Sequence, residues 1–258
     1  MEHSGQVSII GARTSSDSVK GYIVIVPQQA QMSSLPDLVN FERVALRYGR
    51  GPEVLTDATL DLPQGSFTFL TGPSGAGKST LLKLCYLSLI PSRGLIRMFG
   101  KDSALLSNPE RQAIKRRVGV VLQDFHLVDH LSVYENVALP LRVSGQSRAN
   151  YNQDLVELLQ WVGLDHRMQA FPPTLSGGEK QRCAIARAVI AKPDLLIADE
   201  PTGNVDPVIG RRLLRLFAEM NRMGTTILIA THDTHLIDEL DARVLRIEDG
   251  RVFTGKSA

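Results

Sequence analysis

The chain has 258 residues, of which 43% are hydrophobic and 22% charged, as in a soluble globular protein with an ample core. Its formal net charge is +2 and no block of lysine or arginine dominates, so charge argues neither for nor against a nucleic-acid partner. No stretch approaches the roughly 18 consecutive apolar residues of a membrane-spanning helix, so we expect the chain alone neither to cross nor to enter a membrane.

Residues 1–36 differ in composition from the rest of the chain. They are rich in Ser, Gly and Gln and show little hydrophobic periodicity, so we expect a flexible N-terminal extension there. Met32 lies just before the first clear strand pattern, and we expect the folded domain to cover residues 37–258. The extension is interpreted either as a dispensable tail or as the product of a start assigned too early.

From Leu38 onward, strand patterns alternate with helix patterns. Alternating apolar residues predict half-buried strands, and short continuous apolar runs predict buried parallel strands. The predicted strands are 39–44, 60–62, 66–70, 95–99, 195–198 and 226–230, and a hairpin is predicted at Asp249-Gly250.

Helical periodicity separates these strands. The sequence predicts helices over 81–89, ended by Pro91, over 153–162, and around Leu213 to Met220. Together the elements predict an α/β core with a mainly helical insertion over about 125–180. Cys85 and Cys183 lie in apolar helical patterns, which predicts buried, reduced thiols.

Residues 72–80 form the strongest functional pattern, GPSGAGKST. In G-x-x-x-x-G-K-[ST], the glycines let backbone N–H groups turn onto the β- and γ-phosphates, Lys78 reaches the same oxygens, and Ser79 offers a hydroxyl to Mg²⁺. The helix that follows favours an anion at its N-terminus. We expect the whole loop to contact nucleotide: Gly72, Pro73, Ser74, Gly75, Ala76, Gly77, Lys78, Ser79 and Thr80.

Two carboxylates follow the apolar strand predicted at 195–198. Asp199 would lie at the tip of that strand beside the phosphate loop, where it can hold Mg²⁺ through water. Glu200 would then orient, or take a proton from, the water that attacks the γ-phosphate. A surface acidic pair is the alternative, and the phosphate loop upstream favours the catalytic interpretation.

The segment LSGGEKQR at 175–182 resembles the signature motif of ATP-binding-cassette (ABC) ATPases. Ser176 is expected to cap a helix, and Gly177 and Gly178 to expose N–H groups at its start, which makes a second anion site. Such a site has a purpose if it closes over the ATP of another subunit. The resemblance therefore implies a head-to-tail homodimer that forms on ATP binding, with two ATP molecules sandwiched between the subunits.

The other family positions occur in order. Tyr48 matches the aromatic residue placed against adenine, and Gln123 matches the Q-loop glutamine that contacts Mg²⁺ and the attacking water. Asp206 matches the D-loop aspartate at the dimer interface, with Val205 where leucine is usual. His232 matches the switch histidine that senses the γ-phosphate. Taken singly, each also fits a structural role, such as a core aromatic, a surface glutamine or a turn histidine.

The resemblance covers residues 38–253 and implies a fold, an activity and a set of cofactors. The fold is an α/β ABC ATPase of the P-loop NTPase class, with a RecA-like core, a small antiparallel β subdomain and a helical subdomain at about 125–180. The activity is ATP hydrolysis to ADP and phosphate, with ATP and Mg²⁺ as cofactors. Glu200, His232 and Gln123 are the implied catalytic residues, and Ser79, Gln123 and Asp199 the implied metal ligands.

Residues 123–141 are similar to the FtsE family of bacterial cell-division ATPases. That family implies an integral membrane partner of the FtsX type, an indirect link to peptidoglycan hydrolases, and a cytoplasmic chain held peripherally at the inner face of the plasma membrane through this partner. The single cassette, without a heptad insertion or basic stripe, favours no nucleic-acid partner. Two alternatives stay open: the ATPase of a lipoprotein-release or macrolide-type exporter, whose subgroup shares ADEPTGN at 198–204, and a nucleotide-dependent divisome scaffold.

A membrane partner needs a docking groove for an amphipathic or coupling helix. The groove is expected beside the Q-loop, where apolar residues alternate with polar ones. Leu127 and Leu131 fit the interior of the helical lobe equally well. The expected groove residues are Phe125, Leu127, Val128 and Leu131, with Asp124 and His126 at the rim.

Overall fold

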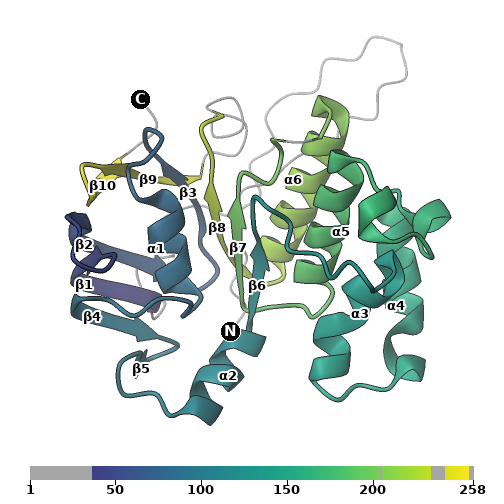
Figure 1. Ribbon diagram of the computed structural model, residues 1–258, viewed down its shortest axis with the longest axis horizontal. Coiled ribbons are helices and arrows are strands. Elements are labelled where there is room, and N and C mark those ends of the chain that lie inside the picture. The colour runs from purple at the N-terminus through teal and green to yellow at the C-terminus, as the bar shows by residue number, and fades with distance from the viewer. Residues whose placement is uncertain (1–36, 204, 234–241, 256–258) are drawn as a thin grey trace, which may run out of the picture.

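The computed structural model describes residues 37–203, 205–233 and 242–255 (Figure 1). The extension expected over residues 1–36, and Asn204 of the ADEPTGN segment, lie outside the described residues. Within the described ranges, none of the helices combines the length and hydrophobicity that a bilayer crossing demands.

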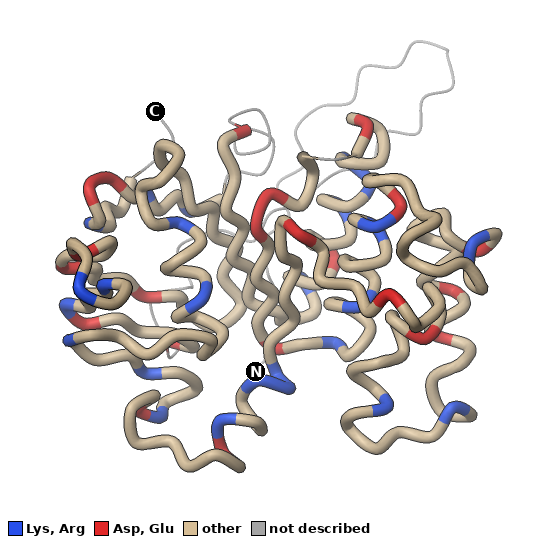
Figure 2. Tube along the Cα trace, in the orientation of Figure 1, with Lys and Arg blue, Asp and Glu red and all other residues tan. Residues whose placement is uncertain are grey.

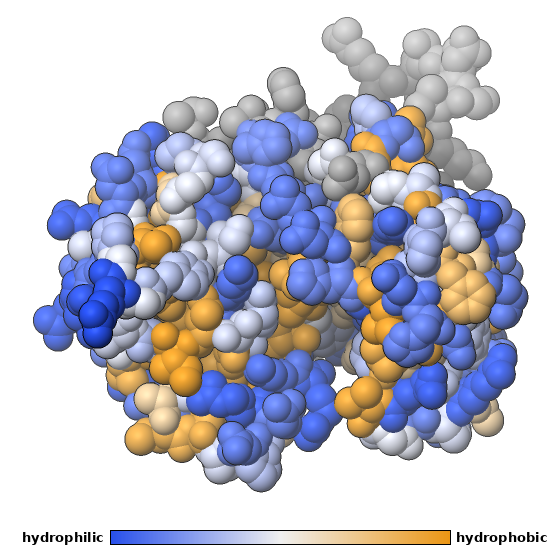
Figure 3. Space-filling model, viewed as in Figure 1, coloured by the Kyte–Doolittle hydropathy of each residue, from blue (hydrophilic) through white to orange (hydrophobic). Residues whose placement is uncertain are grey.

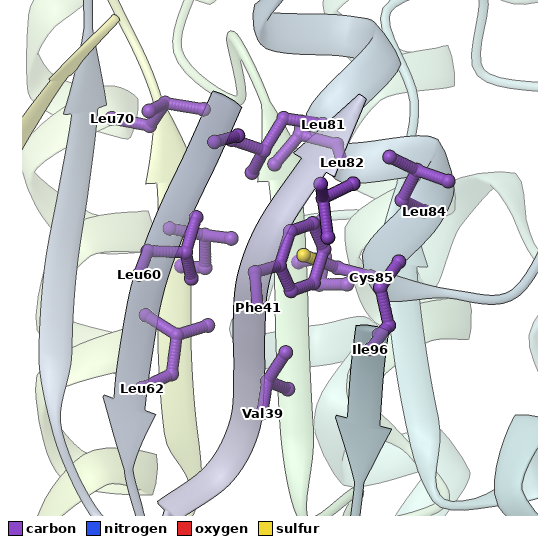
Figure 4. Packing of buried hydrophobic residues seen from close by; sticks show 14 of the residues in the cluster. Val39, Phe41, Leu60, Leu62, Leu70, Leu81, Leu82, Leu84, Cys85 and Ile96 are labelled. Atoms are coloured by element: carbon purple, nitrogen blue, oxygen red, sulfur yellow. The ribbon is translucent and has the colours of Figure 1, made fainter. Parts of the chain in front are cut away.

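Four antiparallel strands form a small sheet in the order β2-β1-β4-β5. The long strand β1 pairs with both β2 and β4, so that Phe41 lies opposite Leu60 on one side and Ile96 on the other. These apolar residues are buried and share one core with residues of helix α1 such as Leu81 and Cys85 (Figure 4). The strands are β1 (Asp37–Arg47), β2 (Glu53–Pro63), β4 (Arg93–Met98) and β5 (Lys101–Asp102).

A second sheet of six strands, in the order β10-β9-β3-β8-β7-β6, forms the centre of the molecule. All its neighbouring strands pair in parallel except the edge strand β10, which returns antiparallel through the turn at Asp249-Gly250. Every residue of β7 and β8 is buried, because layers cover both faces of a parallel sheet. The strands are β3 (Phe67–Thr71), β6 (Val118–Val121), β7 (Leu195–Asp199), β8 (Thr226–Ala230), β9 (Arg243–Glu248) and β10 (Arg251–Gly255).

Helix α1 (Lys78–Cys85) packs between the two sheets (Figure 1). The sequence predicts a helix over 81–89. The observed helix begins three residues earlier and also ends four residues earlier than predicted. The chain leaves the helix because Leu87 has a left-handed backbone with a φ of 57°, and the N–H of Ser88 folds back to the carbonyl of Lys83. The apolar residues that follow therefore pack against the core from a turn, not from a helix.

Helices α5 (Gly177–Val189) and α6 (Pro207–Arg222) cover the other face of the central sheet, and α2 (Asn108–Arg116) leads into β6. Helices α3 (Val133–Val143) and α4 (Arg148–Trp161) form a lobe with its own apolar core. Helix α5 contributes residues to both cores, so it joins the lobe to the sheet.

Trp161, the single tryptophan of the chain, lies at the junction of the lobe and the sheet. It packs against both apolar cores, and the guanidinium of Arg212 on α6 stacks over its ring at 4.8 Å. Cys85 and Cys183 are free and buried, as predicted, and burial raises the pKa of each thiol, to about 12 for Cys183.

The packing of α5 on β6 leaves no room at Gly119. A Cβ atom at this position would lie 2.4 Å from the carbonyl oxygen of Ala188 in α5. We expect Gly119→Ala to lower the free energy of unfolding by about 1–3 kcal/mol, because backbone must move to admit the methyl group. Gly255→Ala is the matched control, since a Cβ there meets nothing within 4 Å. Equal urea midpoints for the two variants would contradict this packing.

Candidate active site

The phosphate loop connects β3 to α1 and depends on glycine at defined positions. Gly72 has a φ of 145°, and a Cβ there would lie 2.2 Å from the carbonyl oxygen of Ile247, so no larger residue fits. Lys78 folds back over the loop, where its Nζ donates to the carbonyl oxygens of Gly72 at 2.8 Å and Pro73 at 3.0 Å. Gly77 gives α1 no side-chain cap, which leaves N–H groups at the helix start for an anion.

Ser79 and Asp199 join this loop to the central sheet. The Ser79 hydroxyl donates to Oδ2 of Asp199 at 2.8 Å, across 120 residues of sequence. Burial raises the pKa of the Asp199 carboxyl, the bond from Ser79 opposes that shift, and the nearby charge of Glu200 adds to it. A cation beside this carboxylate would offset the desolvation of its charge.

The donor set at this point fits Mg²⁺. No cluster of three or more His, Cys, Asp or Glu side chains suited to a metal occurs among the described residues. Mg²⁺ is typically held by one or two protein oxygens together with substrate phosphates and water, rather than by a complete protein cage. The Ser79 hydroxyl and the Asp199 carboxylate supply oxygens of that kind next to the phosphate loop.

Glu200 follows β7 with a left-handed backbone, at a φ of 50°. Its N–H donates to the carbonyl of Ala230 at 2.9 Å, which ties it to the end of β8. Its carboxylate is bound through both oxygens: Oε1 lies 2.7 Å from Nδ1 of His232, and Oε2 accepts from the Thr231 hydroxyl at 3.2 Å. The structure thus brings the predicted residues Glu200 and His232 into direct contact, and Thr231 joins them without having been predicted.

Tyr48 lies at the edge of the same region. Its side chain is exposed, which excludes a place in the core, and its hydroxyl lies 3.2 Å from Oγ1 of Thr80 at the end of the phosphate loop. The contact leaves the ring beside the loop and open to solvent.

Gln123 is exposed, two residues beyond Val121, which pairs with Ala198 of β7. The pairing puts Gln123 at the sheet edge that carries Asp199, although its amide bonds to no described residue. Figure 2 shows acidic residues gathered at this edge, while Lys and Arg are spread over both lobes.

The loop after Gln123 is fixed by a residue that sequence reasoning missed. Phe125 and His126 both have left-handed backbones, with φ values of 60° and 47°. Arg187 of α5 donates to the carbonyl oxygens of both residues at 2.7 Å, and burial lowers the pKa of its guanidinium. Farther along the loop, Leu127 packs against the core of the helical lobe, which favours the interior role for this residue.

The signature segment lies apart from the phosphate loop within one chain. Ser176 caps α5 as predicted, in a reciprocal arrangement in which the N–H of Glu179 donates to Oγ of Ser176 at 3.3 Å and the N–H of Ser176 to Oε2 of Glu179 at 2.8 Å. No hydrogen bond or ion pair between described residues links 176–178 to 72–80. Figure 1 shows α1 and α5 on opposite sides of the strands β6 to β8.

Asp206 has a role within its own chain. Its Oδ1 accepts from the N–H groups of Val208 and Ile209, both at 3.0 Å, so it is the N-cap of α6. Together with Pro207 in the first turn, this arrangement is typical of a helix start. A contact across a dimer interface would have to use the other carboxylate oxygen.

The bond between His232 and Glu200 predicts a measurable titration. The pKa of His232 is raised, first by its hydrogen bond to Glu200 and second by the charge of that carboxylate. The stabilisation from this pair is present below the ordinary histidine pKa of about 6.5 and is lost as pH rises through the raised value. We expect Glu200→Gln to lower the pKa of His232, measured by NMR of the imidazole ring.

Glu219→Gln is the control for this titration. It removes an exposed carboxylate that pairs with Arg222 on α6, away from His232. An unchanged His232 titration in Glu200→Gln, or an equal shift in both variants, would contradict the pairing.

Comparison with known proteins identifies the class of this fold and site. The family model described as ABC transporter matches residues 55–203, and the chain belongs to this family. It is an ATPase of the ABC type. The solved dimeric structure of a post-hydrolysis state of the ATP-binding cassette MJ0796, bound to ADP and Pi, is 30% identical, with a TM-score of 0.79 over 85% of this chain and 99% of that one. The predicted ABC ATPase fold is thereby confirmed.

Within the family, the chain is similar to curated cell-division proteins. It is 44% identical over 218 residues to the cell division ATP-binding protein FtsE of Escherichia coli (strain K12). The aligned residues cover 84% of this chain and 98% of the relative. It is 39% identical over 220 residues to FtsE of Bacillus subtilis (strain 168), and here the aligned residues cover 85% of this chain and 96% of the relative. These identities confirm the resemblance to the FtsE family that residues 123–141 indicate.

Proposed function

We propose that the chain is the ATP-hydrolysing subunit of an FtsE-type complex in cell division. In this complex it would act through an integral membrane partner of the FtsX type on peptidoglycan hydrolases across the membrane. The 2.8 Å bond between Ser79 and Asp199 carries the enzymatic part of the proposal, because it joins a phosphate loop to a carboxylate followed by a candidate base. The similarity to FtsE over 98% of the relative supports the cellular role.

Nucleotide binding would use the residues around the loop. Backbone N–H groups at residues 72–80 and the Nζ of Lys78 would hold the phosphates, once Lys78 exchanges the carbonyls of Gly72 and Pro73 for phosphate oxygens. The ring of Tyr48 would lie against the adenine. Ser79 and Asp199, with Gln123, would hold Mg²⁺, which offsets negative charge on the phosphates when bound.

Hydrolysis needs a water molecule oriented toward the γ-phosphate. Glu200 is the proposed base, and its position at the sheet edge is set by the bond of its N–H to Ala230. His232 holds Oε1 of Glu200 from an exposed position, with 78% of its side chain accessible, so the imidazole is free to turn toward a phosphate. In that movement Oε1 would be released to accept a proton from water.

A second copy of the chain would complete the site. The phosphate loop and the signature residues Ser176, Gly177 and Gly178 lie in different parts of one chain, and Ser176 and Gly177 are exposed at the start of α5. The start of α5 can therefore meet the ATP of a neighbouring subunit, where its N–H groups would bind phosphate. The dimeric state of the solved cassettes supports this arrangement. Asp206 would lie near the interface of the proposed dimer.

Replacement of Glu200 tests the chemistry. We expect Glu200→Gln to bind ATP but to slow phosphate release roughly 10²- to 10⁴-fold, the usual contribution of a general base. Because ATP then persists, the variant should accumulate as a dimer in ATP, as measured by light scattering after size exclusion. Glu219→Gln should turn over like the parent protein. Full turnover by Glu200→Gln would remove Glu200 from the proposed role.

The partner is proposed to dock beside the loop after Gln123. Phe125 is only partly buried and belongs to none of the apolar cores among the described residues, whereas Asp124 and His126 beside it are exposed. Asn136 fixes the next part of this loop through bonds to the backbone of Val128 and Leu131. On the face in Figure 3, the surface is hollowed between the sheet side and the helical lobe, and hydrophobic side chains border the hollow.

Phe125→Ala tests the docking site. We expect it to reduce co-purification of the membrane partner at least several-fold while leaving ATP affinity unchanged, because the hydrogen bonds of Phe125 run to Leu122 and Arg187 and not to residues 72–80. Phe171→Ala is the matched control, since Phe171 is an exposed phenylalanine outside this loop. Co-purification at the parental level with Phe125→Ala would refute the docking role.

The identity of the captured partner also tests the cellular role. Glu200→Gln protein held in ATP would be used to recover partners from detergent-solubilised membranes, followed by mass spectrometry. A partner with a few membrane spans and a large extracytoplasmic loop supports the proposal, and an exporter or lipoprotein-release subunit contradicts it. Normal division of cells carrying only Glu200→Gln would favour a nucleotide-dependent scaffold over a cycling motor.

A further inference from the structure

Thr231 lies where three strands of the central sheet end. It follows β8, is fully buried, and its N–H donates to the carbonyl of Leu70 in β3 at 3.1 Å. The N–H of Glu200, after β7, donates to the adjacent carbonyl of Ala230 at 2.9 Å. The backbone at Thr231 is therefore tied to the strand that leads into the phosphate loop and to the residue proposed as the base.

The hydrogen-bond pattern fixes the direction of the Thr231 hydroxyl. Its Oγ1 accepts from the N–H of Asp233 at 3.1 Å and lies 3.2 Å from Oε2 of Glu200. A hydroxyl has a single proton, and a backbone N–H cannot accept it. An ionised carboxylate only accepts, so the proton of Thr231 is directed at Glu200.

The two oxygens of Glu200 have partners of different kinds. Oε1 is bound by His232, whose side chain is 78% exposed, while Oε2 is bound by the buried hydroxyl of Thr231. When His232 turns away, Oε1 loses its partner and Oε2 keeps its own. A carboxylate held by one oxygen keeps the orientation of its plane, so the free oxygen points in a defined direction.

We propose that Thr231 is a positioning residue that orients the Glu200 carboxylate, so that Oε1 faces the attacking water when His232 releases it. The inference rests on the proposed role of Glu200 as the base. Thr231 itself exchanges no proton with substrate and contacts no nucleotide in this scheme. Its hydroxyl sets the orientation of the base, and its effect should appear in the hydrolytic step and not in ATP binding.

The first measurement is steady-state ATP hydrolysis by Thr231→Val and Thr231→Ser in the full chain. Valine has nearly the shape of threonine but no hydroxyl, so kcat should fall roughly 10-fold, as for the loss of a hydrogen bond to a charged group, with KM unchanged. Serine keeps the hydroxyl and should retain most of the activity. An unchanged kcat in Thr231→Val, or equal losses in both variants, would overturn the inference.

A double-mutant cycle separates positioning from support of the fold. In a Glu200→Gln background, Thr231→Val should change the remaining turnover less than 2-fold, because the oriented carboxylate is already absent. A residue that merely supported the fold would lower turnover in both backgrounds, and that result would overturn the inference. If Thr231→Val does not yield folded protein, Thr231→Cys replaces it, because a thiol is a weak donor of similar size. The kcat of Thr231→Cys should then fall with KM unchanged, as expected for Thr231→Val.

The same variants show whether the proposed function fails or only the positioning role of Thr231 fails. Parental turnover by Glu200→Gln alone would remove the base on which Thr231 is proposed to act, and would overturn both. Slow turnover by Glu200→Gln together with normal turnover by Thr231→Val would leave the proposed function intact and overturn only the positioning role.

Discussion

The bond between Ser79 and Asp199 depends on the parallel register of the central sheet. Leu70, next to the end of β3, pairs with Ala230, and Ala230 pairs with Asp199, so the ends of β3, β8 and β7 lie at one edge of the sheet. Since each strand enters a loop at this edge, the phosphate loop, the carboxylates and His232 converge from distant parts of the sequence. A shift of one residue in any of these pairings would direct the side chains to the opposite face and separate Ser79 from Asp199.

The same edge sets the electrostatic character of the site. Asp199 is a largely buried carboxylate, and desolvation is the main cause of its raised pKa. Glu200 adds a second negative charge next to it, and the positive charges that act on the Asp199 carboxyl are those of Lys78 and Lys83. These carboxylates suit a cation, and both sheets support the site through α1, which packs between them.

Local patterns were sufficient for much of the fold and part of the site. The phosphate loop, the buried strands β7 and β8 and the cap at Ser176 each depend on neighbours within a few residues, and all were predicted. Thr231 and Arg187 were missed because their partners lie about 30 and 60 residues away, at positions that only the assembled sheet and lobe bring together. The N-cap role of Asp206 follows from Pro207 beside it, whereas the family resemblance implies only a role at an interface.

The stacking of Arg212 over Trp161 gives the molecule an optical property. The indole belongs to the last turn of α4, the guanidinium to α6 beneath the sheet, and no other tryptophan contributes to emission from the chain. Any rotation of the helical lobe against the sheet changes the separation of these two groups and the hydration of the indole. The intrinsic fluorescence of the unlabelled protein therefore reports on the junction between the helical lobe and the central sheet.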